Sequence, residues 1–216
     1  MINLKFVSKV AKNQAILSNI NLKIEEGDFV YLTGPSDSGK TTLLKLIYGF
    51  FPPSSGQIVV MGKDIAKLSK GNLSDLRKKV GLVMQDFGFL EKKTAEENLH
   101  LFLSGLSKRE RAVMIDLSLH LVELTPKRKL LVSSLSGSER QQLRLARCVA
   151  LNPKLILADE PLLSLDEKKE RLFLKILLDM NEKGTTVIFA SSRPEDVLMN
   201  TIRKRMVRLS GGRIEE

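Results

Sequence analysis

The stretch Gly34-Pro35-Ser36-Asp37-Ser38-Gly39-Lys40-Thr41 decides the fold, because it matches the G-x4-G-K-[ST] pattern of a phosphate-binding loop. The apolar run Phe29–Thr33 before it is typical of a buried strand, and Lys40–Gly49 is typical of a helix that ends at a glycine. Such a unit points free backbone amides and the positive end of the helix at a phosphate. The stretch therefore predicts a nucleotide site in an α/β fold.

Each residue of this loop has an expected task. Lys40 is expected to contact the β- and γ-phosphates, and the Thr41 hydroxyl is expected to ligate Mg2+. Asp37 stands where related loops most often have glycine; aspartate tolerates a left-handed backbone, but its charge would disfavour phosphate if it faced inward. We therefore expect some loss of nucleotide affinity. The predicted ATP-binding residues here are Gly34, Pro35, Ser36, Asp37, Ser38, Gly39, Lys40, Thr41 and Thr42.

Acidic and amide side chains follow two other apolar runs. Asp159 and Glu160 come directly after Leu155–Ala158, and Gln85 follows Val80–Met84. An aspartate at the end of a buried strand can hold Mg2+ through its water shell, and the next carboxylate can act as a general base toward water. The metal candidates are thus Thr41, Gln85 and Asp159, and the catalytic candidates so far are Glu160, Gln85 and Lys40.

The order of apolar and helical segments predicts one domain with an insertion. Strand-like runs at Gln57–Met61, Val80–Met84, Leu155–Ala158 and Thr185–Ala190 are mostly separated by helical stretches, which is typical of a mostly parallel sheet. Between residues 94 and 151 the strand pattern disappears, and Ser107-Lys108-Arg109-Glu110 has the form of a helix capping box. We expect an α/β core over 1–93 and 152–216 of the single domain 1–216, with a helical subdomain at about 94–151. Ile2–Val7 and Ile16–Ile24 predict an antiparallel arm, and Arg205–Glu216 predicts a closing hairpin.

Composition narrows the class of protein. The 216 residues are 43% apolar and 28% charged, which is ordinary for a globular protein and argues against disorder. The sequence has no apolar run of the ~18–20 residues that a membrane helix needs, and its first residues alternate like a strand rather than a signal peptide. Cys148 is the single cysteine, which suits the cytoplasm, and we expect it to be buried in a helix. The net charge of +10 favours an anionic partner such as a phospholipid surface or nucleic acid.

A further motif, Leu135-Ser136-Gly137-Ser138, precedes the acidic strand, and Ser164-Leu165-Asp166 follows it. With the phosphate loop, Gln85 and the Asp159-Glu160 pair, these motifs occur in the order found in ABC (ATP-binding cassette) ATPases, which the chain resembles over its whole length. The resemblance implies a P-loop NTPase fold with a RecA-like, mostly parallel core sheet, an amino-terminal β arm and an inserted helical subdomain.

The resemblance also implies how such a chain works. ABC ATPases pair head to tail, as a homodimer or with another cassette, and enclose two ATPs between each phosphate loop and the opposite signature. Ser136, Gly137 and Ser138 would then bind the γ-phosphate held by the partner chain, with Asp166 beside them; unpaired amides at a helix start suit this task. ATP would close the dimer, hydrolysis would release it, and attached membrane subunits would follow the movement.

Within the family, Thr42–Gly49, Pro53–Ile58 and Val83–Asp86 most resemble the cell-division branch FtsE and overlap with the lipoprotein-release branch LolD and the exporter branch MacB. The FtsE resemblance implies a membrane partner similar to FtsX, regulation of cell-wall hydrolases, and a place on the cytoplasmic face of the inner membrane. The alternatives are a LolD- or MacB-type export ATPase and an ATP-gated interaction module with little turnover. No nucleic acid is expected, since long coiled-coil or tandem-domain sequence is absent.

Three positions depart from the family pattern. Ser191-Ser192-Arg193 stands where Thr-His-Asp is usual, so Ser192 takes the place of a histidine that contacts the γ-phosphate, and we expect slow hydrolysis. His100 and His120 lie far upstream and are interpreted as ordinary helix residues. Ala11 takes the place of the aromatic that stacks on adenine, at a cost of ~1 kcal/mol or more, and Phe6 is expected to pack in the core. Ser138 replaces the second signature glycine, a change we expect to be tolerated.

Overall fold

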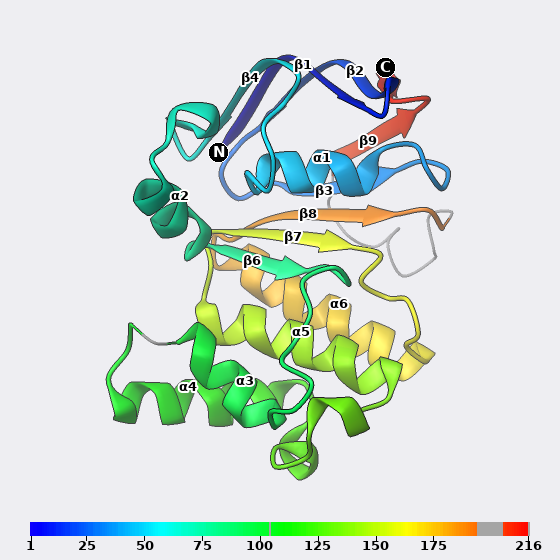
Figure 1. Cartoon of the computed structure of the whole chain (residues 1–216). Helices are drawn as coiled ribbons and strands as arrows, with labels where there is room; N and C mark the ends of the chain where they lie inside the picture. The colour runs from blue at the N-terminus through cyan, green and yellow to red at the C-terminus, as the bar shows by residue number, and fades with distance from the viewer. Residues whose placement is uncertain (104, 194–204, 216) are drawn as a thin grey trace.

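The computed structural model describes residues 1–103, 105–193 and 205–215, in which a six-stranded sheet forms the centre (Figure 1). Its strand order is β10-β9-β3-β8-β7-β6. Strands β9, β3, β8, β7 and β6 are parallel, and β10 pairs antiparallel with β9. The bounds are β3 Phe29–Thr33, β6 Val80–Val83, β7 Leu155–Asp159, β8 Thr186–Ser191, β9 Arg205–Ser210 and β10 Arg213–Glu215. The mostly parallel sheet and the closing hairpin are confirmed.

A second, antiparallel sheet lies above the first in Figure 1 and has the order β2-β1-β4-β5. Its bounds are β1 Ile2–Ala11, β2 Gln14–Ile24, β4 Ser55–Val60 and β5 Lys63–Asp64. The arm predicted from the first two runs is confirmed, but it is larger than expected. The run at Gln57–Met61 belongs to it as β4, because Ile2 pairs with Val60 rather than with a parallel strand.

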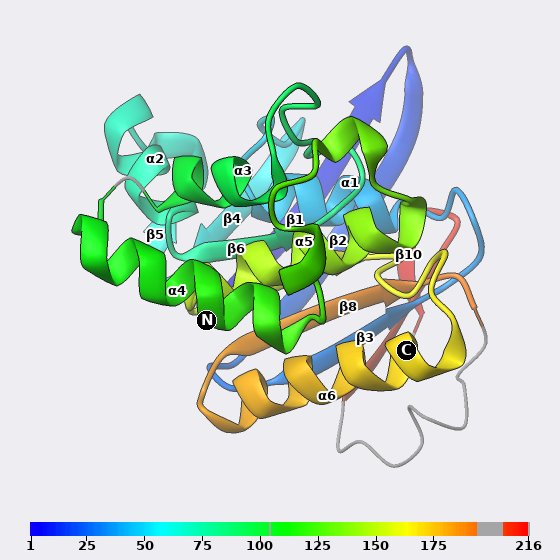
Figure 2. The same ribbon diagram turned by 90° about the horizontal axis from the view of Figure 1, so that it is seen from below.

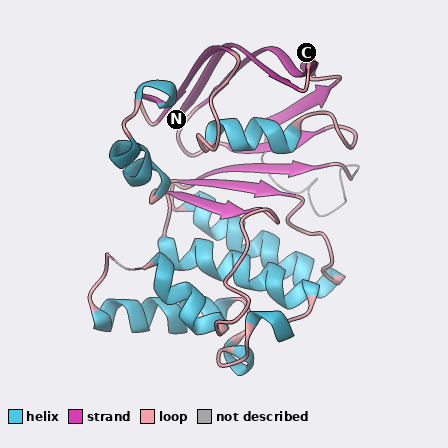
Figure 3. Ribbon diagram, viewed as in Figure 1, coloured by secondary structure: helices cyan, strands magenta, loops and turns pink. Residues whose placement is uncertain are grey.

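Helices occupy both sides of the central sheet (Figure 3). Their bounds are α1 Lys40–Ile47, α2 Lys70–Arg77, α3 Ala95–Phe102, α4 Lys108–Leu121, α5 Gly137–Leu151 and α6 Glu167–Glu182, with 3-10 turns η1 Ile65–Lys67, η2 Thr125–Lys127 and η3 Val132–Ser134. α1 lies between the two sheets, and α5 and α6 cover the opposite face (Figure 1). The capping box predicted at Ser107 is present, with the side chain of Glu110 closing it. None of the helices in the described ranges has the length and apolarity needed to span a bilayer.

Strand β3 shows why the central sheet is buried on both faces. Phe29 and Tyr31 pack toward α5 and α6, whereas Val30 and Leu32 pack toward α1 and the arm. This alternation follows from the two-residue period of a strand. Cys148 is buried in α5, as expected. The two cores hold the carboxyl ends of β3, β7 and β8 at one edge, and that edge carries the functional residues.

The expectation that Phe6 packs in the core is wrong, since 65% of the residue is exposed. Strand β1 changes register between Leu4 and Val7, and both of these residues are buried. Phe6 has a φ of 52° within this irregularity. The bulge therefore places two inward residues three positions apart and turns Phe6 toward solvent.

Candidate functional site: a nucleotide cleft at the end of the central sheet

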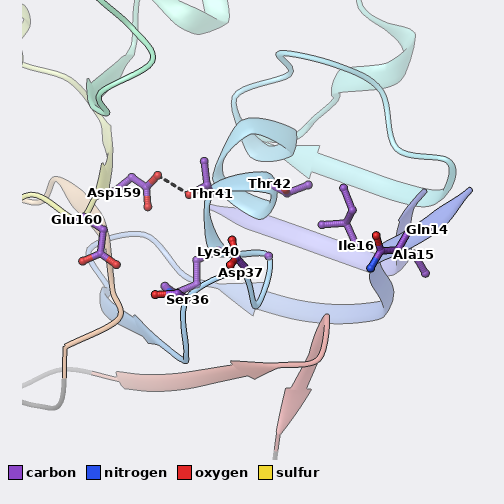
Figure 4. Close-up of a pocket in the computed structure, with 11 residues that line it drawn as sticks. Gln14, Ala15, Ile16, Ser36, Asp37, Lys40, Thr41, Thr42, Asp159 and Glu160 are labelled. Carbon is purple, nitrogen blue, oxygen red and sulfur yellow. Dashed lines mark hydrogen bonds between the residues drawn. The ribbon is translucent and has the colours of Figure 1, made fainter. Parts of the chain in front are cut away.

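A cavity of about 510 Å³ lies over the phosphate loop. Figure 4 shows Asp159 and Glu160 on one side of the loop and Gln14, Ala15 and Ile16 on the other. The remaining lining residues are Ser36, Asp37, Gly39, Lys40, Thr41 and Thr42. The cavity thus joins a loop suited to phosphate, a pair of carboxylates, and a shelf from the start of β2.

The backbone of the loop depends on two unusual positions. Asp37 has a φ of 63°, so this residue adopts the left-handed conformation that it was expected to tolerate. Gly34 approaches β9 so closely that an added Cβ would lie 1.9 Å from the Leu209 carbonyl oxygen. The loop is therefore wedged against the central sheet, and a side chain at Gly34 would push it away.

Lys40 is buried at the start of α1. Its Nζ donates hydrogen bonds to the carbonyl oxygens of Gly34 and Pro35, at 2.7 and 2.8 Å. Burial lowers the pKa of Lys40, and the nearby charges of Glu160, Asp159 and Asp37 oppose that shift. The ammonium group is thus held at the centre of the loop, where phosphate oxygens would meet it.

Thr41 and Asp159 form the contact that links the phosphate loop to β7. The Thr41 hydroxyl donates to Asp159 Oδ2 at 2.7 Å, and Asp159 Oδ1 is buried with no hydrogen-bond partner in the described parts of the chain. Burial raises the pKa of Asp159, partly offset by the Thr41 hydrogen bond. A second cavity of about 290 Å³ brings Gln85 to the same place, beside Thr41, Asp159 and Glu160. Thr41, Gln85 and Glu160 thus place oxygen atoms around the half-buried Asp159 carboxylate, whose Oδ1 is unsatisfied, and this set fits Mg2+, which prefers oxygen ligands and retains several waters.

Glu160 follows β7 with a φ of 44° and is held by the turn after β8. Its Oε1 accepts from the backbone N–H of Ser192 at 2.7 Å, and its Oε2 accepts from Ser191 Oγ at 3.3 Å. Sequence reasoning considered only the side chain of Ser192 and missed Ser191. No motif marks Ser191, because a serine at the end of a buried strand is unremarkable.

The signature and Asp166 lie apart from these residues. Ser136 caps α5: its Oγ accepts from Glu139 N at 3.2 Å, and its own N–H donates to Glu139 Oε2 at 2.8 Å. The Ser136 amide is thus already paired, contrary to the expectation of free amides there. Asp166 caps α6 by accepting from Lys169 N at 2.9 Å, and Lys169 Nζ donates to Ser138 Oγ at 3.0 Å. Neither cavity has a lining residue from Ser136–Ser138 or Asp166 within the described part of the chain.

At the other end of the cleft, Ala11 pairs with Gln14 at the tip of the β1–β2 hairpin. The cavity is lined by Gln14, Ala15 and Ile16, not by Ala11. These three residues are the ones that sequence reasoning missed, because none carries an aromatic ring. A signal was available in the hairpin turn, which returns β2 toward the phosphate loop.

The phosphate loop, the Thr41–Asp159 contact and the Glu160 carboxylate together define a P-loop nucleotide-binding protein. The chain belongs to the ABC transporter family, whose profile matches residues 17–163. It is 35% identical to the cell division ATP-binding protein FtsE of Bacillus subtilis, covering 98% of this chain and 93% of that protein. FtsE of Mycobacterium tuberculosis is 37% identical, covering 99% and 94%.

Methionine import ATP-binding protein MetN of Clostridium acetobutylicum is also 35% identical, covering 100% of this chain and 68% of that protein. Among solved structures, the dimeric post-hydrolysis state of the cassette MJ0796 bound to ADP and Pi superposes with a TM-score of 0.92 at 32% identity, covering 100% of this chain and 97% of that one. The predicted family and fold are confirmed, and the chain is an ABC ATPase. The sequence identity of this chain to FtsE relatives is similar to its identity to the MetN relative, so the comparison does not decide between these branches of the family.

Proposed function

We propose that the chain is the ATP-hydrolysing subunit of an FtsE-like complex on the cytoplasmic face of the inner membrane. ATP-driven closure of a head-to-tail dimer would act on a membrane partner similar to FtsX, which regulates cell-wall hydrolysis. The observation that carries the hydrolytic part is the Thr41–Asp159 contact with Gln85 and Glu160 beside it. The FtsE part is supported by relatives matched over nearly their full length.

The roles of the site residues follow from their positions. Lys40 binds the β- and γ-phosphates, and Thr41, Gln85 and Asp159 hold Mg2+, which would neutralise charge on the phosphates. Glu160 accepts a proton from the attacking water, and Gln85 orients that water. Gly34–Thr42 and the β2 shelf hold the rest of the nucleotide.

The dimer supplies what one chain lacks. Ser136, Gly137, Ser138 and Asp166 are remote from the chain's own cavity, which supports their acting on the ATP of a partner. MJ0796, a relative of similar length, is described as dimeric. We propose the same arrangement here, with residues 94–151 moving as one helical subdomain against the core.

A cavity of about 260 Å³ offers a place for the membrane partner. It lies between the core and the helical layer and is lined by aromatic and basic side chains, among them Tyr48, Phe87, Phe102, Arg77 and Arg147. Arg147 stacks on Phe102 at 4.8 Å and donates to the Leu82 carbonyl at 2.9 Å. Arg147 is buried, so Arg77 and Lys78 supply the positive charge at this surface, which together with the aromatic side chains suits a partner segment at an anionic membrane surface.

A second candidate is an ATP-gated interaction module with little turnover, and the observation that favours it is at Ser192. This residue contacts Glu160 only through its backbone N–H among the hydrogen bonds of the described residues. Its side chain is too short to reach the γ-phosphate as a histidine would. Ser192→His tests this, because the substituted side chain leaves the Ser192 N–H bond to Glu160 in place. Turnover that rises several-fold, with ATP-dependent dimerisation unchanged, supports a slow ATPase; turnover that does not rise contradicts the role given to Ser192.

The branch is tested by binding to membrane subunits. The Glu160→Gln variant, loaded with Mg-ATP, is passed over immobilised FtsX-type, lipoprotein-release-type and methionine-import-type subunits in detergent. Retention by the FtsX-type subunit alone supports the proposal. Retention by the lipoprotein-release type supports the LolD or MacB alternative, and equal retention by all three contradicts the FtsE assignment.

A further inference from the structure

The turn that holds Glu160 is itself anchored to α6 by an ion pair. Arg193 Nη1 donates to Glu170 Oε1 at 2.7 Å. The Glu170 side chain is only 12% exposed and that of Arg193 is 41% exposed. Because the carboxylate is shielded from water, this pair is stronger than a fully exposed one. α6 packs against the sheet face formed by β3 and β8 (Figure 2), so the ion pair joins the end of β8 to this helix.

The main chain of Arg193 is fixed as well. Its N–H donates to Ser191 Oγ at 3.1 Å, and its carbonyl accepts from the Tyr31 hydroxyl at 3.3 Å. Tyr31 is buried in β3 and stacks on Phe189 of β8, with ring centroids 5.7 Å apart. The turn therefore meets β3 through Tyr31 and α6 through Glu170.

Glu160 is connected to Arg193 by hydrogen bonds through Ser191 and Ser192. Ser191 Oγ accepts from Arg193 N and donates to Glu160 Oε2, while the N–H of the intervening Ser192 donates to Glu160 Oε1. Both carboxylate oxygens thus depend on the position of a three-residue turn. A single hydroxyl and a single peptide therefore connect Arg193 to Glu160.

We propose that Arg193, acting through its ion pair with Glu170, is a positioning residue that aligns Glu160 for ATP hydrolysis. The inference rests on the proposed role of Glu160 as the base. Ser192 offers only a short side chain, so the backbone bond is the firm contact to Glu160, and the Arg193–Glu170 pair sets where that backbone lies. Reaction rates depend steeply on such alignment, while binding of the nucleotide does not.

Helix α6 gives this anchor a connection to the signature. Asp166 caps the helix, Lys169 donates to Ser138 Oγ, and Glu170 holds Arg193. These residues lie within two turns of one another. The position of the catalytic carboxylate is therefore linked through one rigid helix to the motif expected to meet the partner's ATP.

The test compares Arg193→Gln and Glu170→Gln with a matched control, Arg171→Gln. Arg171 is on the same helix and pairs with Glu167, but both side chains are largely exposed. Single-turnover hydrolysis with protein in excess measures the chemical step, a fluorescent ATP analogue measures affinity, and thermal unfolding checks the fold. We expect both test variants to hydrolyse about tenfold more slowly, with unchanged affinity, while Arg171→Gln behaves as the wild type.

Rescue separates positioning from general damage. The exchanged pair Arg193→Glu with Glu170→Arg should recover most of the rate if the ion pair is what matters. Wild-type rates in both single variants, or equal slowing in Arg171→Gln, would overturn the inference. Glu160→Gln distinguishes the premise: if it hydrolyses ATP like the wild type, the role of Glu160 fails, whereas if only Glu160→Gln is slow, the positioning role alone fails.

Discussion

Asp159→Asn should make the nucleotide-free protein more stable while abolishing its stabilisation by Mg-ATP. Asp159 is a half-buried carboxylate whose Oδ1 has no hydrogen-bond partner among the described residues, and burial raises its pKa. Ionisation of this carboxylate therefore costs more free energy in the folded chain than in the unfolded chain. An asparagine retains the shape and can still accept the hydrogen bond from Thr41, but it removes the charge.

The magnitude follows from the shift in proton affinity. Each unit by which the pKa of Asp159 is raised on folding corresponds to about 1.4 kcal/mol of destabilisation above that pKa. We expect the free energy of unfolding without nucleotide to rise in Asp159→Asn at pH 7, because the amide does not carry the buried charge. The gain should shrink as pH falls through the raised pKa, because protonation then neutralises the wild-type carboxylate as well.

Mg-ATP should reverse the order of stability of the wild type and Asp159→Asn. At an Mg-ATP concentration 100 times Kd, a binding-competent chain gains about 2.7 kcal/mol of stability. Urea unfolding with and without Mg-ATP measures both effects, and the exposed Asp179→Asn on α6 is the control that should alter neither. An Asp159→Asn chain that is less stable than the wild type without nucleotide, or that keeps the full Mg-ATP stabilisation, would refute the reasoning.

Three further predictions concern other parts of the molecule. Glu96 accepts hydrogen bonds from Arg128 and Lys129, which lower its pKa to about 2, so it stabilises the fold above pH ~4.5 and this contribution is lost as pH falls toward 2; Glu96→Gln should remove about 1–3 kcal/mol of that pH dependence in urea unfolding. Burial raises the pKa of Cys148 to about 12, so a thiol reagent at pH 8 should react only on unfolding, and fast labelling of the folded chain would contradict this. Ala11→Tyr should tighten ATP binding about fivefold if its ring reaches the cleft, and unchanged affinity in a fluorescent-analogue titration would place adenine elsewhere.

Sequence patterns predicted the parts of this fold that have strong local signals. The phosphate loop, the buried strand β7 and the capping box at Ser107 each depend on neighbouring residues, and each was found where the pattern placed it. Phe6 and β4 were misassigned because their positions depend on partner strands. A bulge in β1 and the pairing of Ile2 with Val60 are long-range effects that a single strand does not encode.

The contacts of Glu160 are also long-range and were not predicted from sequence patterns. A comparison of side chains treats Ser192 as a lost histidine and predicts only a deficit. In the structure, Ser192 contacts Glu160 through its backbone N–H. Every residue except proline carries this group, so the contact cannot be predicted from the identity of the side chain. The neighbouring Arg193 pairs with Glu170, which lies 23 positions earlier and on another element, so no local pattern predicts this contact. The Ser192 N–H contacts Glu160 directly, and we propose that the Arg193–Glu170 ion pair positions the same carboxylate, so substitutions that displace the Ser192 N–H should be non-additive with Arg193→Gln. Additive effects on the hydrolysis rate would mean that the two residues act on different steps.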